Sequence, residues 1–208
     1  MKIAILANSQ QKEELLSQGV LEGTELLWVN EITGLVDADA YIDLLFENEK
    51  TRIDYLKKIQ GPVIVSSVIA AAENLPANFI RINGWPTFLK RSIVEAAYVS
   101  DAFRVSDTFE DIFSCFNKRT EWTPDIPGFV TARVIATIIN EAYFTLEENV
   151  STKNEIDTAM KLGTNYPYGP FEWSEKIGLK NVYALLAELM KTNSRYKPND
   201  LLKKEALQ

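Results

Sequence analysis

The chain of 208 residues contains no histidine and only one cysteine, Cys115. Without histidine there is no imidazole general base, no Ser-His-Asp or Cys-His nucleophile and no histidine-ligated metal. A single cysteine excludes an internal disulfide and a cysteine-based structural zinc site. Together with the lack of a secretory signal at the start of the chain, this cysteine usage predicts a cytoplasmic protein without a metal site.

Basic residues are also scarce, since 22 lysines and arginines stand against 29 acidic residues and give a formal net charge of −7. Binding to nucleic-acid phosphates depends on a basic excess, so no nucleic-acid partner is expected. No apolar run approaches the ~20 residues of a membrane-spanning helix, which argues against a membrane partner. The content of 46% hydrophobic and 25% charged residues is that of a globular chain, large enough for one large domain or two small ones.

The first part of the chain alternates between two kinds of pattern. Short runs of apolar, β-prone residues alternate with helical patterns. The predicted strands are 2–6, 25–29, 40–46, 62–65 and 79–82, and the predicted helices between them include 11–18 and 48–59. Strands that alternate with helices predict βαβ units and a mostly parallel sheet.

From about residue 124 the pattern is helical throughout. Asp125 followed by Pro127 is typical of a helix start, and the next 19 residues, 129–147, carry an apolar stripe with a period of ~3.6 residues. Further helices are predicted at 153–162, 170–177 and 179–191, with Gly163 and Gly178 as C-terminal stops. The sequence therefore predicts two domains, 1–123 and 124–208.

The helical half contains several sequence blocks in a fixed order: DIPGFV at 125–130, Arg133, NEA at 140–142, IDTAMKLG at 156–163 and YPYGPFE at 166–172. These blocks resemble the C-terminal domain of the 3-hydroxyacyl-CoA dehydrogenase family. The resemblance implies an N-terminal Rossmann domain that binds NAD and a helical domain that usually forms the dimer. It also implies a histidine that takes the proton of the 3-hydroxyl, a glutamate that orients this histidine, and a serine and an asparagine that hold the substrate.

The α/β half departs from the length of that family's first domain. Residues 36–42 resemble the segment that leads into the family's fourth strand, yet they follow only a few residues after Asn30. The helix and strand that normally lie between these points are absent. The fold class expected is therefore α/β, with a reduced Rossmann-like, mostly parallel sheet, followed by an all-helical C-terminal domain.

The dinucleotide-binding turn of the family also differs here. Its chemistry needs glycines between the first strand and the first helix, because only glycine lets the backbone approach the pyrophosphate. In this chain Asn8 and Ser9 stand in that turn, and the first glycine is Gly19. The second strand ends at Asn30 instead of an acid that would bind the ribose. The sequence therefore predicts no cofactor; NAD would bind only if Asn8, Ser9 and Asn30 replace the usual groups.

The candidate catalytic residues are Glu95 and Asn83. The segment 92–96 resembles the family block that carries the orienting glutamate, and twelve positions before Glu95, where the family has its histidine, stands Asn83. An amide does not titrate near neutral pH and can only form hydrogen bonds. Glu95 then either takes the proton itself, through water, or is an ordinary polar residue near a strand end.

The candidate substrate-binding residues are Ser66, Ser67 and Thr131. Ser66 and Ser67 resemble the family's serine turn after the fourth strand, although a serine pair is also a common N-cap, here for a helix at 68–73. The family's substrate asparagine falls on Ala132, so this polar contact is lost unless Thr131 replaces it.

Three functions remain open on this reading. The first is a catalytically degenerate family member that is a homodimer through its helical domain and binds an acyl-CoA or a partner protein. The second is an active NAD-dependent 3-hydroxyacyl-CoA dehydrogenase with substituted groups, and the third is a structural or regulatory subunit. The lost residues favour the first and third. The dimer is expected because helix 129–147 is apolar on nearly two faces, although the α/β domain is the alternative cover.

Overall fold

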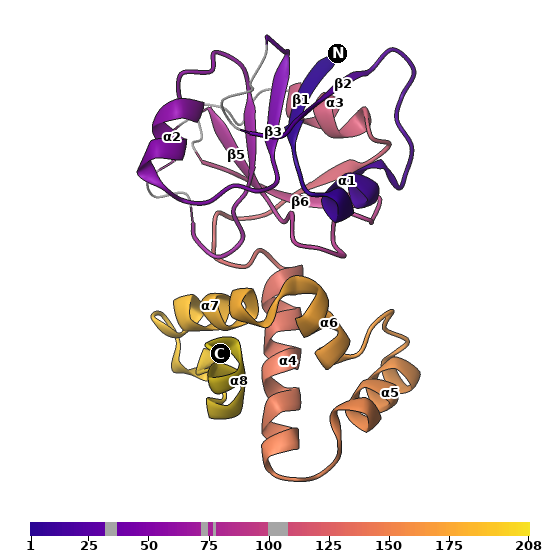
Figure 1. Cartoon of the computed structure of the whole chain (residues 1–208), viewed down its shortest axis with the longest axis vertical. Helices are drawn as coiled ribbons and strands as arrows, with labels where there is room; N and C mark the ends of the chain where they lie inside the picture. Colours follow the sequence, from indigo (N-terminus) through magenta and orange to yellow (C-terminus); the bar gives the residue numbers. More distant parts are fainter. Residues whose placement is uncertain (32–36, 72–74, 77, 100–107) are drawn as a thin grey trace. The chain divides into compact units, whose positions relative to one another are not determined.

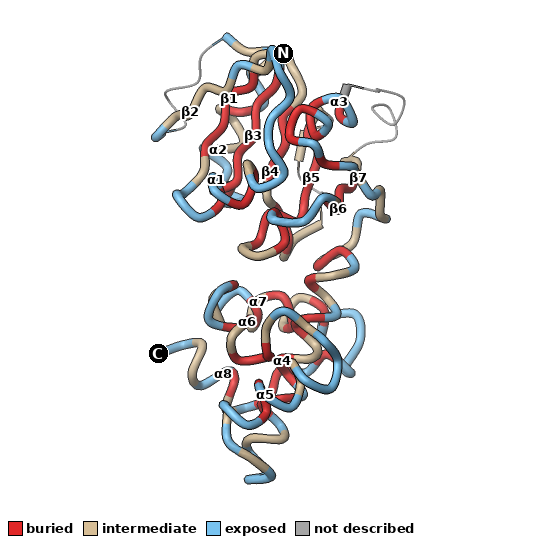
Figure 2. The backbone as a smooth tube through the Cα atoms, turned by 90° about the vertical axis from the view of Figure 1, so that its right-hand side faces the viewer, coloured by how far each residue is buried: buried red, intermediate tan, exposed pale blue. Residues whose placement is uncertain are grey.

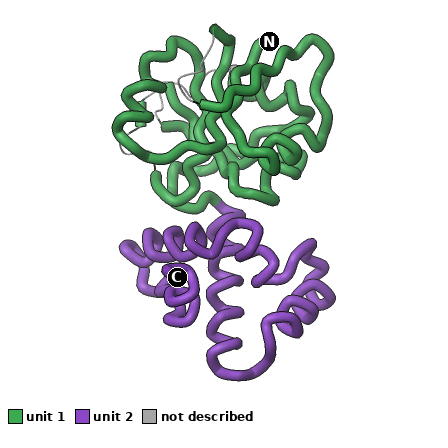
Figure 3. Tube along the Cα trace, in the orientation of Figure 1, with its two compact units in different colours: residues 1–129 green, residues 130–208 purple. Residues whose placement is uncertain are grey.

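The computed structural model describes residues 1–31, 37–71, 75–76, 78–99 and 108–208. The chain divides into two compact units, Met1–Phe129 and Val130–Gln208 (Figure 3). The first unit contains all seven strands of the described residues, and the second contains helices only.

The first unit is built on one sheet with the strand order β2-β1-β3-β4-β5-β6-β7 (Figure 1). All neighbouring strands are parallel except β5 and β6. This mostly parallel sheet confirms the expected fold class. The strands are β1 (Lys2–Leu6), β2 (Glu25–Val29), β3 (Ala40–Asp43), β4 (Val63–Ser66), β5 (Phe79–Ile82), β6 (Ile93–Tyr98) and β7 (Arg119–Trp122). The helices are α1 (Ser9–Leu16), α2 (Lys50–Leu56) and α3 (Thr108–Ser114).

The sheet order reverses at β1. The chain runs from β1 outward to β2, then returns to place β3 on the other side of β1. Within the described residues β2 bonds to β1 alone, so it forms one edge of the sheet, as expected for a Rossmann-like sheet that lacks the family's third strand. In such sheets ligands bind beyond the carboxyl ends of the strands at the reversal, which here are the ends of β1 and β3.

Both faces of the central strands are buried, as in sheets covered by helices on each side (Figure 2). Alternate side chains of each strand point to opposite faces. One face packs with α1 and α3, through residues that include Ile64, Leu15 and Phe113. The other face packs with α2, through residues that include Val63 and Leu56.

The second unit consists of α4 (Thr131–Glu147), α5 (Lys153–Thr164), α6 (Pro170–Ile177), α7 (Leu179–Met190), a 3-10 turn (Ser194–Tyr196) and α8 (Asp200–Ala206). Helix α4 lies at its centre and packs against α6, α7 and α8. Its inward face consists of buried residues: Ala132, Ile135, Ala136, Ile139, Asn140, Ala142 and Tyr143. Among the described residues, no helix has both the length and the apolar character that crossing a bilayer requires.

Helix termini differ from the sequence predictions in two places and agree with them in a third. Asp125 is not a cap, because α4 begins at Thr131 and Val130 precedes it without a side-chain cap. Gly163 does not end a helix: it lies inside α5, which ends before Asn165 in the left-handed region, with φ 56°. Gly178, with φ 88°, separates α6 and α7 as predicted.

Candidate functional site

Asn83 and Glu95 form a buried pair at the carboxyl end of β5. Asn83 follows β5 directly, and its backbone N–H donates to the Glu95 carbonyl oxygen across 3.0 Å. The Asn83 side chain donates from Nδ2 to Glu95 Oε2 at 2.9 Å. Their exposed fractions are 2% and 6%. Glu95 thus lies within β6, rather than near a strand end, and its carboxylate accepts a hydrogen bond from the Asn83 side chain.

One atom of this pair has no protein partner. Asn83 Oδ1 is buried and accepts no hydrogen bond from any described residue. A buried acceptor without a donor is costly, so such an atom in a folded protein calls for an explanation.

The serine turn lies beside this pair. Ser66 is the last residue of β4, and a Cβ placed on Gly84, the residue after Asn83, would lie 2.5 Å from Ser66 Oγ. Ser67 is buried, and its hydroxyl donates to the Ala70 carbonyl oxygen at 3.4 Å. Residues 68–71 are not helical, and 72 and 73 lie outside the described residues, so the interpretation of this pair as a helix N-cap is wrong for the part that the structure describes.

Arg81 holds the serine turn in place. Its side chain is fully buried, and Nε and Nη2 donate to the Ser67 carbonyl oxygen at 3.0 and 2.8 Å. Nη1 forms an ion pair with Asp125, and the guanidinium lies 4.9 Å from the centre of the Phe129 ring. Burial lowers the pKa of Arg81, and the charge of Asp125 opposes this shift. Asp125 therefore serves as a counter-ion rather than as a helix cap.

The turn between β1 and α1 is closed by its own side chains. Asn8 Oδ1 accepts from the Gln11 backbone N–H at 2.8 Å, and Gln11 Oε1 accepts from the Asn8 backbone N–H at 3.1 Å. Gln11 is 5% exposed, and its Nε2 donates to the Leu44 carbonyl oxygen at 2.8 Å and to that of Gly84 at 3.4 Å. This capping box therefore links α1 to the ends of β3 and β5.

Further contacts fasten α1 to the segment after Asn83. Both carboxylate oxygens of buried Glu14 accept from the Thr87 N–H, at 2.9 and 2.8 Å, and hold Thr87 at a φ of 78°. Such a φ is rare for a β-branched residue and marks a constrained turn. Lys118, also buried, donates from Nζ to the carbonyl oxygens of Leu89 and Arg91 at 2.7 and 2.8 Å. Burial lowers the pKa of Lys118 to about 8.

Comparison with known proteins identifies the family. Residues 128–207 match the family model described as 3-hydroxyacyl-CoA dehydrogenase, C-terminal domain. This part of the chain is a 3-hydroxyacyl-CoA dehydrogenase C-terminal domain, and curated 3-hydroxybutyryl-CoA dehydrogenases are similar to most of the chain. It is 44% identical over 85 residues to the 3-hydroxyadipyl-CoA dehydrogenase of Escherichia coli K12, a match that covers 40% of this chain and 18% of that protein.

Two further matches cover most of this chain. The 3-hydroxybutyryl-CoA dehydrogenase of Bradyrhizobium diazoefficiens is 29% identical over 199 residues, 87% of this chain and 67% of that protein. The crystal structure of (S)-3-hydroxybutyryl-CoA dehydrogenase from Ralstonia eutropha superimposes with a TM-score of 0.74 at 18% identity and covers 98% of this chain and 92% of that one. At this identity the superposition supports the fold alone.

The residues of this 3-hydroxyacyl-CoA dehydrogenase relative do not fit the NAD of its family. A dinucleotide pyrophosphate binds the free N–H groups at the first helix's N-terminus, and glycines allow its approach. Here the Asn8 side chain takes one of these N–H groups, and the buried Gln11 side chain lies across the ends of β3 and β5. Ser9 is exposed in the first turn of α1, and Asn30 is exposed after β2.

Several of these groups were missed by the sequence reasoning. The spacing of Asn8 and Gln11 matches a capping box, and this signal was available. Glu14 and Lys118 are charged residues whose partners are far away in the sequence, so no local pattern marks them. Thr131, the remaining substrate candidate, is the half-buried first residue of α4 in the second unit.

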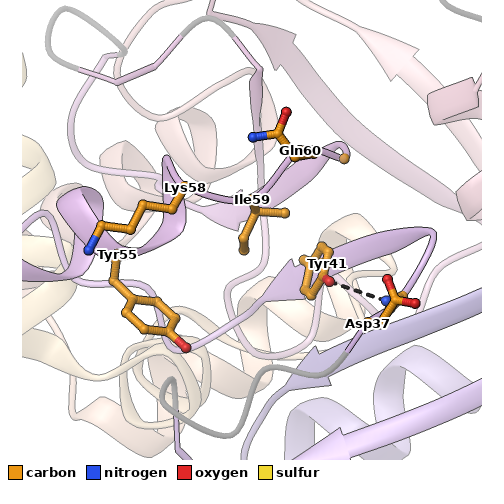
Figure 4. Close-up of a pocket in the computed structure, with 8 residues that line it drawn as sticks. Asp37, Tyr41, Tyr55, Lys58, Ile59 and Gln60 are labelled. Atoms are coloured by element: carbon orange, nitrogen blue, oxygen red, sulfur yellow. Dashed lines mark hydrogen bonds between the residues drawn. The ribbon is translucent and has the colours of Figure 1, made fainter.

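The first unit also has a pocket at the other end of its strands. Figure 4 shows a pocket of about 430 Å³ lined by residues that include Tyr41, Tyr55 and Lys58. The Ala38 N–H donates to Tyr41 Oη there, at 3.2 Å. Tyr41 stands near the start of β3, and Gly61 just precedes β4, so this pocket is at the amino ends of the strands. Asn83 and Ser66 lie at the opposite edge of the sheet.

Proposed function

We propose that this chain is a catalytically degenerate member of its family that binds acyl-CoA as a homodimer and does not transfer hydride. The observation that carries the proposal is the buried pair of Asn83 and Glu95. An amide cannot accept the proton of a 3-hydroxyl group at neutral pH, and losing a general base costs ~10²–10⁴-fold in rate. The pair keeps a polar binding position without the base.

The acyl-CoA part of the proposal is supported by the groups that gather beside Asn83. The relatives are named for their action on 3-hydroxyacyl-CoA thioesters. In this chain the Ser66 hydroxyl lies against Gly84, and the unpartnered Oδ1 of Asn83 lies in the same region of the sheet edge. A hydroxyl and an amide oxygen are groups suited to a polar substituent on an acyl chain.

The closed turn at α1 supports the loss of NAD. Its capping box already uses one of the N–H groups at the start of α1 that a pyrophosphate would bind, and Gln11 is held by hydrogen bonds to two carbonyl groups. NAD binding would require these contacts to break. A single buried cysteine without a disulfide supports a reducing compartment such as the cytoplasm.

The homodimer is supported by apolar surface on the second unit. An apolar groove of about 400 Å³ lies between α4 and α5, lined by residues that include Ile138, Ala142, Ile156 and Met160. On α4 itself Val134 is 48% exposed, whereas Ile135, Ile139 and Tyr143 are buried within the unit. A second copy that covers the groove would bury on the order of 1,600 Å² in total.

Two enzymatic measurements test the catalytic part. We expect no NADH oxidation with acetoacetyl-CoA at high protein concentration, and no saturable change of NADH fluorescence on titration with the protein. A turnover of ~1–10³ s⁻¹ would show that the substituted groups still support dehydrogenase activity. Saturable NADH binding without turnover would contradict only the argument that the closed turn at α1 prevents NAD binding. The argument from the lost general base would stand.

Binding and mass measurements test the other parts. Isothermal titration calorimetry with acetoacetyl-CoA and butyryl-CoA should show saturable binding; if no thioester binds, the acyl-CoA function is wrong and a structural or protein-binding role becomes the better reading. Light scattering at two concentrations should give twice the chain mass of 23.5 kDa. A mass near 23.5 kDa at both concentrations would rule out the dimer.

A further inference from the structure

We infer that Glu95 determines which end of the Asn83 amide faces a ligand, and that the site therefore prefers 3-hydroxyacyl thioesters over 3-oxoacyl thioesters. The inference rests on the proposed acyl-CoA function and names the form of ligand that this site selects. It makes Glu95 a positioning residue and Asn83 the residue that contacts the ligand.

The orientation of the amide follows from its partner. A side-chain amide has a donor end and an acceptor end, whereas a carboxylate only accepts. Asn83 Nδ2 lies 2.9 Å from Glu95 Oε2, so the donor end is turned toward Glu95. The backbones are fixed as well, because Ile82 pairs with Ala96 and the Asn83 N–H donates to the Glu95 carbonyl oxygen. The acceptor, Oδ1, must then point away from Glu95.

The acceptor end has no donor among the described residues, although Asn83 is only 2% exposed. A ligand hydroxyl can donate a hydrogen bond to Oδ1 and satisfy it. A ketone oxygen can only accept, so a 3-oxo group would place two acceptors against each other and leave both unpaired. The site therefore distinguishes the two forms by the hydroxyl hydrogen, which only the 3-hydroxy form can donate.

An asparagine in place of the family's histidine changes which hydrogen bonds this position can form with a ligand. A neutral imidazole accepts at its free nitrogen and a protonated imidazole donates there, so a histidine at this position serves both forms. An amide held by a carboxylate serves only as an acceptor. The neighbouring Ser66 hydroxyl can donate or accept as it rotates, so it does not provide the discrimination.

The experiment compares three thioesters with the same four-carbon acyl chain on the full-length protein. Isothermal titration calorimetry is carried out with 3-hydroxybutyryl-CoA, acetoacetyl-CoA and butyryl-CoA. We expect 3-hydroxybutyryl-CoA to bind about tenfold more tightly than acetoacetyl-CoA, the size expected when one of the two forms leaves a buried acceptor unpaired.

A variant then tests the role of Glu95. In Glu95→Gln the new amide can present either its oxygen or its nitrogen to Asn83, so the Asn83 amide is free to turn and the affinity ratio should fall toward one. Glu121→Gln is the matched control, because Glu121 is the residue of β7 that pairs with Glu95 in the register and is exposed. It should keep the tenfold ratio.

The outcomes separate the inference from the function on which it rests. Equal affinities of the wild-type protein for the hydroxy and oxo thioesters would overturn the inference while the acyl-CoA function stands. Binding of none of the three would overturn both. An unchanged ratio in Glu95→Gln would overturn the role of Glu95, and the wild-type comparison remains decisive if this variant does not fold.

Discussion

Asp125 should matter far more for stability than its position suggests. Its side chain is 30% exposed, and an ion pair at such a site is usually worth ~0–1 kcal/mol. Its partner, however, is Arg81, whose side chain is fully buried. Asp125→Ala therefore leaves a buried guanidinium without its counter-ion. Breaking a buried pair in this way costs ~3–5 kcal/mol, which is a large part of the ~5–15 kcal/mol of an ordinary domain.

Two further variants divide this cost into its parts. Asp125→Asn keeps an oxygen that can accept from Arg81 and should lose less, about 1–2 kcal/mol. Arg81→Met removes the charge and leaves the Ser67 carbonyl oxygen without its two donors. The double variant with Asp125→Ala should lose clearly less than the sum of the two single losses, because no stranded charge remains.

Urea unfolding followed by tryptophan fluorescence is the suitable assay. Three of the four tryptophans lie in the first unit, and a Trp173→Phe background restricts the signal to that unit. For a unit of this size the Asp125→Ala loss corresponds to a fall in Tm of roughly 10–20 °C. A loss below about 1 kcal/mol for Asp125→Ala would show that Arg81 does not depend on this carboxylate, and the reasoning would fail.

Three other predictions use the same methods. In Gly169→Ala the new methyl group would meet the Asp157 carboxylate, which accepts from two backbone N–H groups at the start of α6, so we expect the free energy of unfolding to fall by roughly 2–3 kcal/mol. Gly163 lies inside α5 with open space around it, so Gly163→Ala should raise the free energy of unfolding by ~0.5–1 kcal/mol. Equal effects of the two variants would contradict this reasoning. The pKa of Lys118 is lowered to about 8 from an ordinary 10.5, so the folded chain releases this proton at a lower pH than the unfolded chain does. The free energy of unfolding of the wild type, relative to that of Lys118→Met, should therefore rise between pH 8 and 10.5. Parallel curves of unfolding free energy against pH for the two proteins would contradict this prediction. Asn83→His should restore no NAD reduction with 3-hydroxybutyryl-CoA, because the closed turn at α1 remains; activity of this single variant would show that only the base was missing.

Local patterns predicted the elements whose side chains follow a clear period. The strands β1, β2 and β5 have the predicted bounds, and α6 does too. The strand β3 ends at Asp43 rather than at residue 46, because the Asp43 carboxylate accepts from the Leu45 N–H and turns the chain. The strand β7 was not predicted, since its four residues are mostly polar and its burial alternates only weakly.

In the candidate site, too, some contacts could be predicted from the sequence and others could not. The family resemblance assigned Asn83 and Glu95 to the positions of a histidine and the glutamate that orients it, and the two side chains are hydrogen-bonded. The contacts of Gln11 with Leu44 and Gly84 cross 33 and 73 positions, so no window of the sequence contains both partners. From the sequence alone, Gln11 would be taken for an exposed residue of its helix, because its burial depends on segments far away in the chain. The closed turn could therefore be recognised only in the structure.

The edge formed by β2 has a consequence for self-association through the backbone. The outer N–H and C=O groups of an edge strand are open to pairing with a strand of another molecule, and proteins usually protect such edges with charges, bulges or coverage. Among the described residues β2 bonds to β1 alone, and it contains Leu26, Leu27 and Trp28, with Glu25 as its one charged residue. The Lys12 ammonium lies 4.4 Å from the centre of the Trp28 ring and places a second charge beside the strand. Among the described residues, the Glu25 carboxylate and the Lys12 ammonium are therefore charges that we expect to oppose pairing of this edge with the sheet of a neighbouring molecule.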